Sequence, residues 1–334
     1  MSTSRPKFLV LAEPELARDE WDALCAIAEP IWPKATNRTE LLAELQSGNL
    51  DGVVAAYRAF RSTPLTGPMN AEFIAAVPSS LKFICSEGAG YDAIDISACT
   101  ARRISVSNTP TAVDDATADT AIFLLLGALR NFHASIVSLR KGDWSNGVSR
   151  GHDPQGKVLG ILGMGGIGRN MAVKARAFGM TIRYHNRNQL SPEEEAGAEY
   201  VSFEALLKES DVISLNLPLN AKTRHIISTK EFSLMKPGVV IVNTARGAVI
   251  DEAALVEALD SGHVASAGLD VFEDEPRIHP GLLANQNVLL LPHMGTATQE
   301  TDKKMENWTL DNLKMALTEG RLKTIVPDQR GVTP

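Results

Sequence analysis

Three residues of types that could act together on a carbonyl compound lie in three short segments of the second half of the chain. Arg246 lies in Val-Asn-Thr-Ala-Arg-Gly, Glu275 in Gly-Leu-Asp-Val-Phe-Glu-Asp-Glu-Pro and His293 in Leu-Pro-His-Met-Gly-Thr. Each segment coincides with the end of an apolar run typical of a buried strand. Because ligands bind at the carboxyl ends of the strands of a parallel sheet, we expect an arginine, a carboxylate and a histidine to meet at one edge.

These residue types suit hydride transfer to a ketone. The addition leaves an oxyanion that must receive a proton, and a histidine that titrates near neutrality is a natural general acid, or base in reverse. A carboxylate beside the imidazole orients it and favours its charged form, while an arginine binds a substrate carboxylate through two parallel hydrogen bonds and polarises the carbonyl. Each residue alone also fits a structural role, Glu275 for example in an acidic turn with Glu273 and Asp274. Together they predict Arg246, Glu275 and His293 as catalytic residues.

A glycine-rich motif upstream predicts a dinucleotide-binding site. Gly163-Met164-Gly165-Gly166-Ile167-Gly168 matches G-x-G-x-x-G. Alone it is a weak signal, but it follows an apolar strand and opens a helical pattern. The first glycine permits the tight turn, the second lets the backbone approach a pyrophosphate, and the third lets helix and strand pack closely. The N–H groups at the start of the helix would face the phosphate charge.

The end of the next strand bears on the choice of cofactor. An acidic residue about 20 residues beyond the glycines would hold the ribose 2′-hydroxyl of NAD. This chain has Asn186-Arg187-Asn188 there and no carboxylate until Glu193. A 2′-phosphate is then not repelled, and Arg187 offers a planar cation suited to phosphate. We predict NADP(H) as the preferred cofactor, with NAD(H) as the alternative if Arg187 is merely a solvated strand-end residue.

The motifs together resemble those of the D-isomer-specific 2-hydroxyacid dehydrogenases. N-x-A-R-G, G-L-D-V-F-x-x-E-P and P-H-x-G-x-A-T follow G-x-G-x-x-G at the spacing of this family, and the resemblance covers nearly the whole chain. The strand end at 186–188 and the sequence Gly88-Ala89-Gly90-Tyr91-Asp92 look most like the glyoxylate/hydroxypyruvate reductase branch. The resemblance implies reduction of a small 2-oxo acid to the D-2-hydroxy acid, with Arg246 as substrate anchor, Glu275 as partner of His293, and His293 as general acid.

The resemblance implies further contacts with cofactor and substrate. Asp270 and the Ala245 carbonyl would hold the nicotinamide amide, and the N–H groups of Ala89 and Gly90 would bind the substrate carboxylate. Leu217 and Pro218 would line the adenosine pocket, with Thr223 near the phosphates or ribose and Gly295 by the nicotinamide; Thr244 completes the expected cofactor-binding residues.

The presumed substrate loop, Tyr57-Arg58-Ala59-Phe60, is more aromatic and basic than glyoxylate requires. With Tyr57 and Arg58 as substrate-binding residues, bulkier 2-oxo acids of the phenylpyruvate, mandelate or sugar-acid type stay open. The alternative is that both aromatic rings pack under the loop.

The remaining pattern predicts two α/β domains that position these groups. Strand-like segments are expected at 8–12, 52–57, 81–86 and 104–109, and in a second series at 158–162, 181–186, 212–217, 239–244, 265–270 and 288–291. Helical patterns lie at 14–28, 69–77, 96–102, 115–130, 167–178, 203–208, 252–260 and 298–319, and Asn37 and Glu40 offer a capping pair for one more. We expect a flavodoxin-like substrate domain of residues 1–108 and 304–334, a Rossmann domain of residues 109–303 with a doubly wound parallel sheet, and substrate in a cleft between them.

Composition limits the partners. A net charge of −7 argues against nucleic acid. Three cysteines without metal-type spacing predict no metal site and a reducing compartment. The N-terminal apolar run is too short for a signal peptide, and the longest apolar stretch, 121–129, is far below the ~20 residues of a membrane helix. We therefore expect a cytoplasmic protein without membrane association.

The resemblance also implies a homodimer. The helix starting near Asp115 and the segment 140–144 would belong to the dimer interface, where Trp144 would either reach the partner's active site or simply pack. Two other functions stay open. One is a dinucleotide-sensing scaffold like the C-terminal-binding-protein corepressors, which resemble the same family and retain the three catalytic residue types. The other is a dehydrogenase of phosphonate or 3-phosphoglycerate type, which differs in substrate only.

Overall fold

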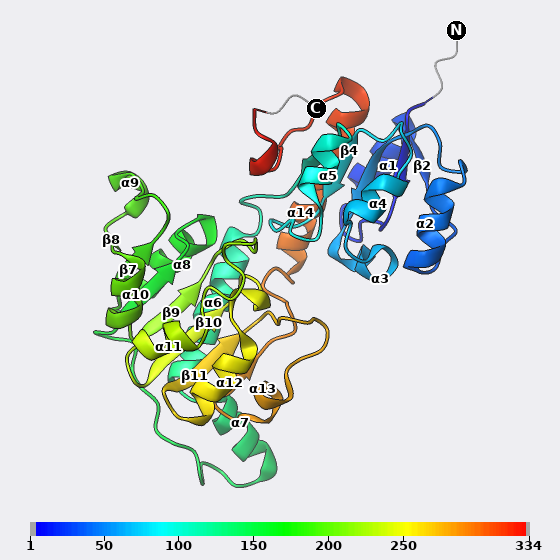
Figure 1. Ribbon diagram of the computed structural model, residues 1–334. Helices are drawn as coiled ribbons and strands as arrows, with labels where there is room; N and C mark the ends of the chain where they lie inside the picture. The colour runs from blue at the N-terminus through cyan, green and yellow to red at the C-terminus, as the bar shows by residue number, and fades with distance from the viewer. Residues whose placement is uncertain (1–4, 332–334) are drawn as a thin grey trace. The chain divides into compact units, whose positions relative to one another are not determined.

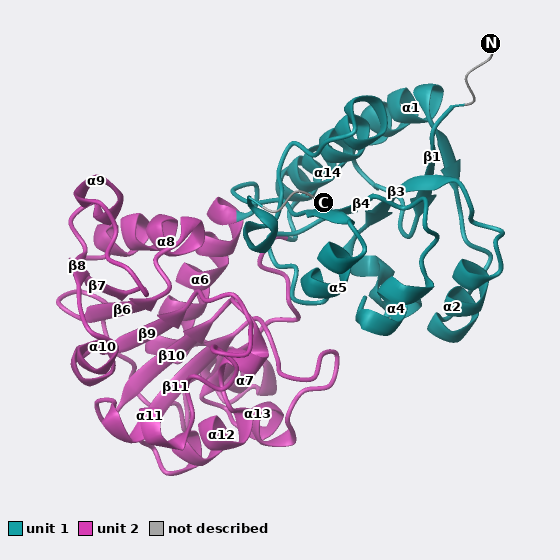
Figure 2. Cartoon of the chain, turned by 45° about the horizontal axis from the view of Figure 1, so that its top comes forward, with its two compact units in different colours: residues 1–113, 297–334 teal, residues 114–296 magenta. Residues whose placement is uncertain are grey.

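The computed structural model describes residues 5–331 and divides the chain into two compact units. Unit 1 comprises residues 1–113 and 297–334, and unit 2 comprises residues 114–296 (Figures 1 and 2). These boundaries lie a few residues from the expected ones at 108/109 and 303/304. The difference at the second boundary arises because the last helix, α14 (Gln299–Glu319), belongs to unit 1 from its first turn.

Unit 1 is built on a five-stranded parallel sheet in the order β2-β1-β3-β4-β5, which is the flavodoxin-like order. Its strands are β1 (Lys7–Val10), β2 (Glu29–Ile31), β3 (Val53–Arg58), β4 (Phe83–Ser86) and β5 (Ser105–Ser107). Its other helices are α1 (Arg18–Ile27), α2 (Arg38–Gln46), α3 (Thr63–Thr66), α4 (Ala71–Ala76) and α5 (Ile96–Ala101), with short 3-10 helices at Phe60–Ser62 and Pro327–Gln329.

Alternate residues of these strands fill two cores. Phe8 and Tyr57 pack with α1 and α14, while Leu9 and Ala56 pack with α2, α4 and α5. The two groups of helices lie on opposite sides of the sheet (Figure 2). This alternation follows from the period of two in a strand. Helix α2 begins as expected, because the Asn37 side chain accepts a hydrogen bond from the Glu40 N–H group at 3.0 Å.

Unit 2 is a doubly wound Rossmann sheet of seven parallel strands in the order β12-β11-β10-β9-β6-β7-β8. The strands are β6 (Val158–Leu162), β7 (Thr181–His185), β8 (Glu199–Tyr200), β9 (Val212–Leu215), β10 (Val239–Asn243), β11 (Val264–Leu269) and β12 (Val288–Leu290). The helices are α6 (Asp114–Leu129), α7 (Phe132–Lys141), α8 (Gly166–Ala177), α9 (Pro192–Glu195), α10 (Phe203–Glu209), α11 (Thr229–Leu234), α12 (Glu252–Asp260) and α13 (Pro280–Ala284), with a 3-10 helix at Gly247–Val249. Helices α6 and α8 pack on one face, and α10, α11 and α12 on the other.

Two features bear on membranes and metals. In the described part of the chain, no single helix is long and apolar enough to cross a bilayer, although α6 and α7, bent by 68° at their junction, reach that length and composition together. Residues 5–331 likewise contain no group of three or more histidine, cysteine, aspartate or glutamate side chains placed to hold a metal ion.

Candidate active site

His293 and Glu275 form a hydrogen-bonded pair at the carboxyl edge of the unit 2 sheet. His293 Nδ1 lies 2.8 Å from Glu275 Oε2, and both side chains are about three-quarters buried. His293 follows β12 and has a left-handed backbone, with φ at +51°. Its N–H group donates to the Asp270 carbonyl oxygen at 2.7 Å, which ties the His293 segment to the end of β11.

Glu275 is held in its ionised form. Burial opposes ionisation, but the hydrogen bond and charge of His293, the Phe272 N–H group and the charge of Arg246 together hold the pKa of Glu275 below its ordinary value. The Phe272 N–H group donates to Glu275 Oε1 at 2.9 Å. Because an ionised carboxylate only accepts hydrogen bonds, His293 Nδ1 must carry the hydrogen atom and donate a hydrogen bond to Glu275.

Asp270 organises the segment that carries His293. Its side chain is almost fully buried, and its two oxygens accept hydrogen bonds from the N–H groups of Met294 and Gly295, each at 2.8 Å. Burial raises the pKa of Asp270 above its ordinary value, against these hydrogen bonds and the charge of His293. The structure thus assigns Asp270 a positioning contact that the sequence did not predict; its contact with a nicotinamide amide stays a prediction.

Arg246 follows β10 in a turn closed by Asn243. The Asn243 side chain accepts from the Ala245 N–H group at 3.0 Å and donates to the Arg246 carbonyl oxygen at 2.9 Å. The guanidinium donates to the Ala245 carbonyl oxygen at 2.7 Å, and its charge lowers the pKa of Glu275. The asparagine of N-x-A-R-G is therefore a turn residue that sets where Arg246 leaves the sheet.

Gly247 explains why a glycine follows this arginine. A Cβ atom at Gly247 would lie 1.8 Å from the carbonyl carbon of Phe272 and 2.2 Å from the Glu273 nitrogen. Only a residue without a side chain allows the two backbones to approach so closely. The segments carrying Arg246 and Glu275 pack together for this reason.

The glycine motif forms the turn expected of a dinucleotide site. Gly163 has φ at +99° and follows β6, and a Cβ atom at Gly168 would lie 2.6 Å from the Gly163 carbonyl oxygen. Gly165 precedes the first residue of α8 and differs from both, because a Cβ atom there would meet nothing within 4 Å. The motif thus leaves open space beside the N-terminus of α8, where a pyrophosphate would bind.

Substitution of Gly165 should separate folding from cofactor binding. The backbone of Gly165, with φ at −84°, is open to any residue, so we expect Gly165→Ala to leave the melting temperature unchanged while weakening dinucleotide binding by about tenfold or more. Gly168→Ala is the matched control, since its Cβ would strike the Gly163 carbonyl oxygen and lower the melting temperature. Fluorescence titration and thermal unfolding measure the two effects; unchanged cofactor affinity in Gly165→Ala would contradict the assignment.

Asn186 connects the glycine turn to the end of β7. Its side-chain oxygen accepts a hydrogen bond from the Met164 N–H group at 2.7 Å, and the Tyr200 hydroxyl donates to its carbonyl oxygen at 3.1 Å. Because an N–H group can only donate, the side-chain oxygen of Asn186 must face the Met164 N–H group. The side-chain NH₂ group of Asn186 therefore points away from Met164. Arg187 and Asn188 follow and are exposed.

The other expected cofactor residues lie at neighbouring strand ends of the same sheet. Leu217 and Pro218 follow β9, and the Thr223 hydroxyl closes their turn by donating to the Pro218 carbonyl oxygen at 2.7 Å. Thr244 is buried, and its hydroxyl has no hydrogen-bond partner among the described residues. The side-chain oxygen of Asn216, a residue that the sequence did not single out, is likewise buried and unpartnered in the part of the chain that the structure describes. Two such orphaned atoms, at strand ends of the sheet that carries the open glycine turn, fit a bound dinucleotide.

The placement of Tyr57 and Arg58 in a substrate loop is wrong. Both are the last residues of β3 and are buried, at 0% and 4% exposed. Tyr57 points into the core beside Trp21, and its hydroxyl donates to Glu87 at 2.9 Å. The loop begins only at Ala59, and Phe60, which is 61% exposed, is its aromatic residue. The expected strand at 52–57 ended one residue too early, and its last residue, Tyr57, was also assigned to the loop.

The loop with Ala89 and Gly90 presents two N–H groups. Gly88 is pinned by Thr109, whose hydroxyl accepts from the Gly88 N–H group at 2.8 Å, and the Ala89 carbonyl oxygen accepts from the Asn108 side chain at 2.8 Å. Within residues 5–331, the N–H groups of Ala89 and Gly90 donate to no other group. Adjacent N–H groups on a fixed loop are typical of an anion site.

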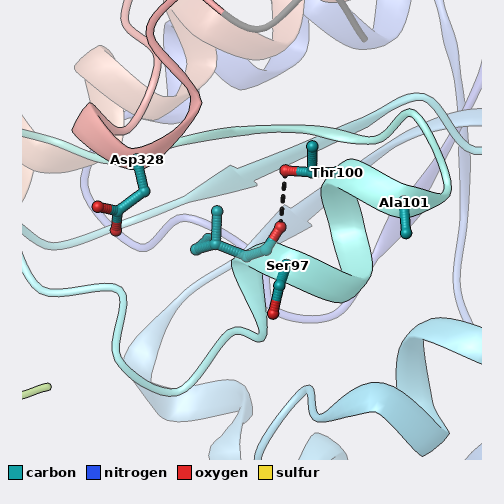
Figure 3. Close-up of a pocket in the computed structure, with 5 residues that line it drawn as sticks. Ser97, Thr100, Ala101 and Asp328 are labelled. Atoms are coloured by element: carbon teal, nitrogen blue, oxygen red, sulfur yellow. Dashed lines mark hydrogen bonds between the residues drawn. The ribbon is translucent and has the colours of Figure 1, made fainter. Parts of the chain in front are cut away.

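A shallow hollow in unit 1 lies beside α5 and the 3-10 helix at Pro327–Gln329, and none of the predicted site residues lines it (Figure 3). Its lining residues are Ile96, Ser97, Thr100, Ala101 and Asp328. Thr100 donates to the Ile96 carbonyl oxygen within α5 at 2.8 Å, and Asp328 is the only titratable residue of the lining. The hollow offers no pair of groups for acid–base chemistry.

Comparison with known proteins identifies the family. Residues 122–295 match the model of the D-isomer specific 2-hydroxyacid dehydrogenase NAD-binding domain. The chain is 55% identical to 4-methyl-2-oxopentanoate reductase A of Aspergillus oryzae over 98% of this chain and 99% of that protein, and 47% identical to glyoxylate reductase 1 of Saccharomyces cerevisiae over 98% and 96%.

Two solved structures agree over nearly the full length. A glyoxylate reductase from Paecilomyes thermophila matches with a TM-score of 0.95 and 55% identity, covering 98% of this chain and 100% of that one. The holo form of Rhodotorula graminis D-mandelate dehydrogenase matches with a TM-score of 0.92 and 35% identity, covering 97% and 98%. The chain belongs to the D-isomer specific 2-hydroxyacid dehydrogenase family and is a nicotinamide-dinucleotide-dependent oxidoreductase.

Proposed function

We propose that this protein reduces 2-oxo acids to D-2-hydroxy acids with NADPH, in the manner of the glyoxylate/hydroxypyruvate reductases. The observation that carries the proposal is the His293–Glu275 pair beside Arg246, on the same sheet edge as an open glycine turn. The bound nicotinamide supplies the hydride. A kinetic screen of glyoxylate, hydroxypyruvate, 4-methyl-2-oxopentanoate and phenylpyruvate with NADPH and NADH tests it. Cofactor binding without turnover of any of them would instead support a dinucleotide-sensing scaffold.

The charge and hydrogen bonding of each residue determine its proposed role in the reaction. Arg246 binds the substrate carboxylate and polarises the carbonyl. In unit 1, the Ala89 and Gly90 N–H groups form an anion site suited to a carboxylate. His293 donates a proton to the oxygen that becomes the hydroxyl. Because Nδ1 donates to Glu275 at 2.8 Å, proton transfer to substrate falls to Nε2. Glu275 keeps the imidazole oriented and stabilises its charged form.

A bulkier substrate has specific support as a second candidate. The relative from Aspergillus oryzae is named for 4-methyl-2-oxopentanoate, and the Rhodotorula graminis structure is a mandelate dehydrogenase. In this chain Phe60 is 61% exposed in the loop after β3, where an apolar ring could contact a substrate side chain. Higher kcat/KM for 4-methyl-2-oxopentanoate or phenylpyruvate than for glyoxylate would favour this candidate.

The preference for NADPH rests on Asn186 and Arg187. With its oxygen turned to Met164, Asn186 presents N–H donors rather than the acceptors of a carboxylate, and the exposed Arg187 adds a cation. A 2′-phosphate accepts hydrogen bonds and carries negative charge, so both groups favour it over a hydroxyl.

Arg187→Ala should weaken NADPH binding by about tenfold to a hundredfold, the loss expected for hydrogen bonds to a charged group. NADH affinity should change less than about twofold, because the 2′-hydroxyl carries no charge to pair. Kd values for both cofactors measure the difference. Arg224→Ala, which removes another half-exposed arginine of unit 2, serves as control. Equal losses for the two cofactors would defeat the assignment.

We also propose a homodimer through α6 and α7. These helices and the segment after them expose large apolar side chains that a monomer would bury, namely Phe123, Phe132, Ile136, Leu139 and Trp144. Large exposed apolar side chains gathered on adjoining helices are typical of an interaction site. Ile136→Arg with Leu139→Asp should convert a dimer to a monomer in sedimentation equilibrium; a wild-type monomer at micromolar concentration would overturn this proposal.

Cytoplasmic location is proposed because Cys25, Cys85 and Cys99 are all free thiols.

A further inference from the structure

One buried acid has no role in the chemistry described above. Glu87 directly follows β4 and directly precedes the loop Gly88–Ala89–Gly90. Its side chain is 8% exposed. Its N–H group continues the strand pairing by donating to the Arg58 carbonyl oxygen at 2.8 Å, so the backbone at Glu87 is fixed. A carboxyl group is thus held two and three residues before Ala89 and Gly90, whose N–H groups are proposed to bind the substrate carboxylate.

Glu87 is surrounded by groups from three other elements of unit 1. From β3, the Tyr57 hydroxyl donates to Oε2 at 2.9 Å, and Arg58 adds a buried cation that donates to Ser86. From the loop after β3, Arg61 Nη1 lies 3.9 Å from Oε1. From α14, which packs against β3 and β4 (Figure 2), the charges of Asp302 and Glu306 face it.

Arg61 cannot neutralise all of these acids. Its guanidinium lies 3.1 Å from Glu306, 3.7 Å from Glu15 and 3.9 Å from Glu87, and it also donates to the Glu13 carbonyl oxygen. The arginine is therefore closest to Glu306 and furthest from Glu87.

The ionised form of Glu306 is stabilised by more hydrogen bonds than that of Glu87. Its two oxygens accept hydrogen bonds from the N–H groups of Glu15, Leu16 and Ala17 at 2.6 to 2.8 Å. Although burial opposes ionisation, these donors and Arg61 hold the pKa of Glu306 below its ordinary value.

Within residues 5–331, the Glu87 carboxylate accepts one hydrogen bond, from Tyr57, and it lies further from the Arg61 guanidinium than Glu306 does. Burial raises the pKa of Glu87 to about 7, against the opposing effects of Arg61 and Tyr57, and the charges of Glu306 and Asp302 raise it further. Glu306 is thus ionised, whereas Glu87 keeps its proton up to neutral pH.

We propose that Glu87 determines the affinity of the protein for 2-oxo acids: uncharged, it leaves the Ala89–Gly90 loop able to accept a carboxylate, and ionised, it repels that carboxylate. The proposal rests on the proposed function of this loop. Glu87 is a positioning and specificity residue rather than a catalytic one, because it acts on the substrate only through the electrostatic potential at the loop. A unit charge about 10 Å away at an effective dielectric constant of roughly 20 to 40 changes affinity by about threefold to fifteenfold.

The test compares oxalate binding by isothermal titration calorimetry from pH 5.5 to 9 in the full-length protein saturated with NADPH. Glu87→Gln keeps the shape and cannot ionise, so we expect its affinity to equal that of wild type at pH 5.5 and to exceed it by about threefold to fifteenfold at pH 8.5. Any pH dependence that the two proteins share cancels in the ratio of their affinities. Glu15→Gln, which removes an exposed acid that faces the same arginine, is the control and should follow wild type.

A second variant keeps the proposal falsifiable if Glu87→Gln folds poorly. Tyr57→Phe removes the hydroxyl that stabilises the ionised form, so the pH at which oxalate affinity declines should move upward. Identical pH dependence in wild type, Glu87→Gln and Tyr57→Phe overturns the proposal. Turnover of 2-oxo acids is measured separately: its absence, with the pH difference in oxalate binding intact, would refute the proposed function and leave the role of Glu87 standing.

Discussion

Replacing His293 with asparagine should lower kcat for 2-oxo acid reduction by about 10²-fold or more while cofactor binding survives. The substitution removes the imidazole that donates a proton to the forming hydroxyl. Asparagine is the suitable replacement because His293 has φ at +51°, a backbone region that asparagine tolerates better than alanine. The N–H group of residue 293 can still donate to the Asp270 carbonyl oxygen, so the segment should keep its shape. Steady-state kinetics measure kcat, and a dinucleotide titration measures the affinity for the cofactor.

A matched control exists in the same unit. His225 also has φ at +51°, and its Nε2 lies 2.5 Å from the Glu273 carboxylate. His225→Asn therefore makes the same chemical change at the same backbone conformation beside a similar partner. We expect His225→Asn to retain kcat within about threefold of wild type, since a partly exposed polar contact contributes little to the stability of the protein. An unchanged kcat in His293→Asn, or an equal loss in both variants, would remove His293 from its role.

The sequence could predict most of unit 2 because its strands are buried on both faces. Fully apolar runs such as Val239–Val242 predict such strands directly. Parallel pairing then places the carboxyl ends of all the strands at one edge of the sheet. Arg246, Glu275 and His293 follow such runs, so their meeting at one edge could be anticipated. The sequence did not predict the edge strands β2 and β8, which are only three and two residues long. It also did not predict helix α7, because its apolar residues Ile136 and Leu139 are exposed and give no burial pattern.

Contacts between residues far apart in sequence could not be predicted. Arg61 and Glu306 are separated by 245 positions, and no periodicity connects them. The hydrogen bond from Met164 to the Asn186 side chain depends on the register of β6 with β7, which the motif alone does not specify. Tyr57 was misplaced for a related reason: its position in β3 is set by pairing with Cys85 in β4, not by its own neighbours.

Arg246→Lys is expected to lower kcat/KM by about 10²-fold to 10³-fold. Lysine keeps the positive charge near Glu275, so the electrostatic support that lowers the pKa of that carboxyl is largely retained. What is lost is the planar fork, which can form two parallel hydrogen bonds with a carboxylate where an ammonium acts as a point charge. Dinucleotide affinity should be unchanged, because the glycine turn and Asn186 are untouched.

The division of this loss between kcat and KM identifies what the arginine does. If Arg246 only anchors the carboxylate, KM rises and kcat holds; if it also polarises the carbonyl as the oxyanion forms, kcat falls as well. We expect both to change, with the larger part in kcat. Arg224→Lys, at a half-exposed arginine 3.6 Å from Glu273, should change neither by more than about twofold, in keeping with the small contribution of exposed ion pairs. A kcat/KM within twofold of wild type in Arg246→Lys would show that charge alone suffices, and the assignment of bidentate binding would have to be abandoned.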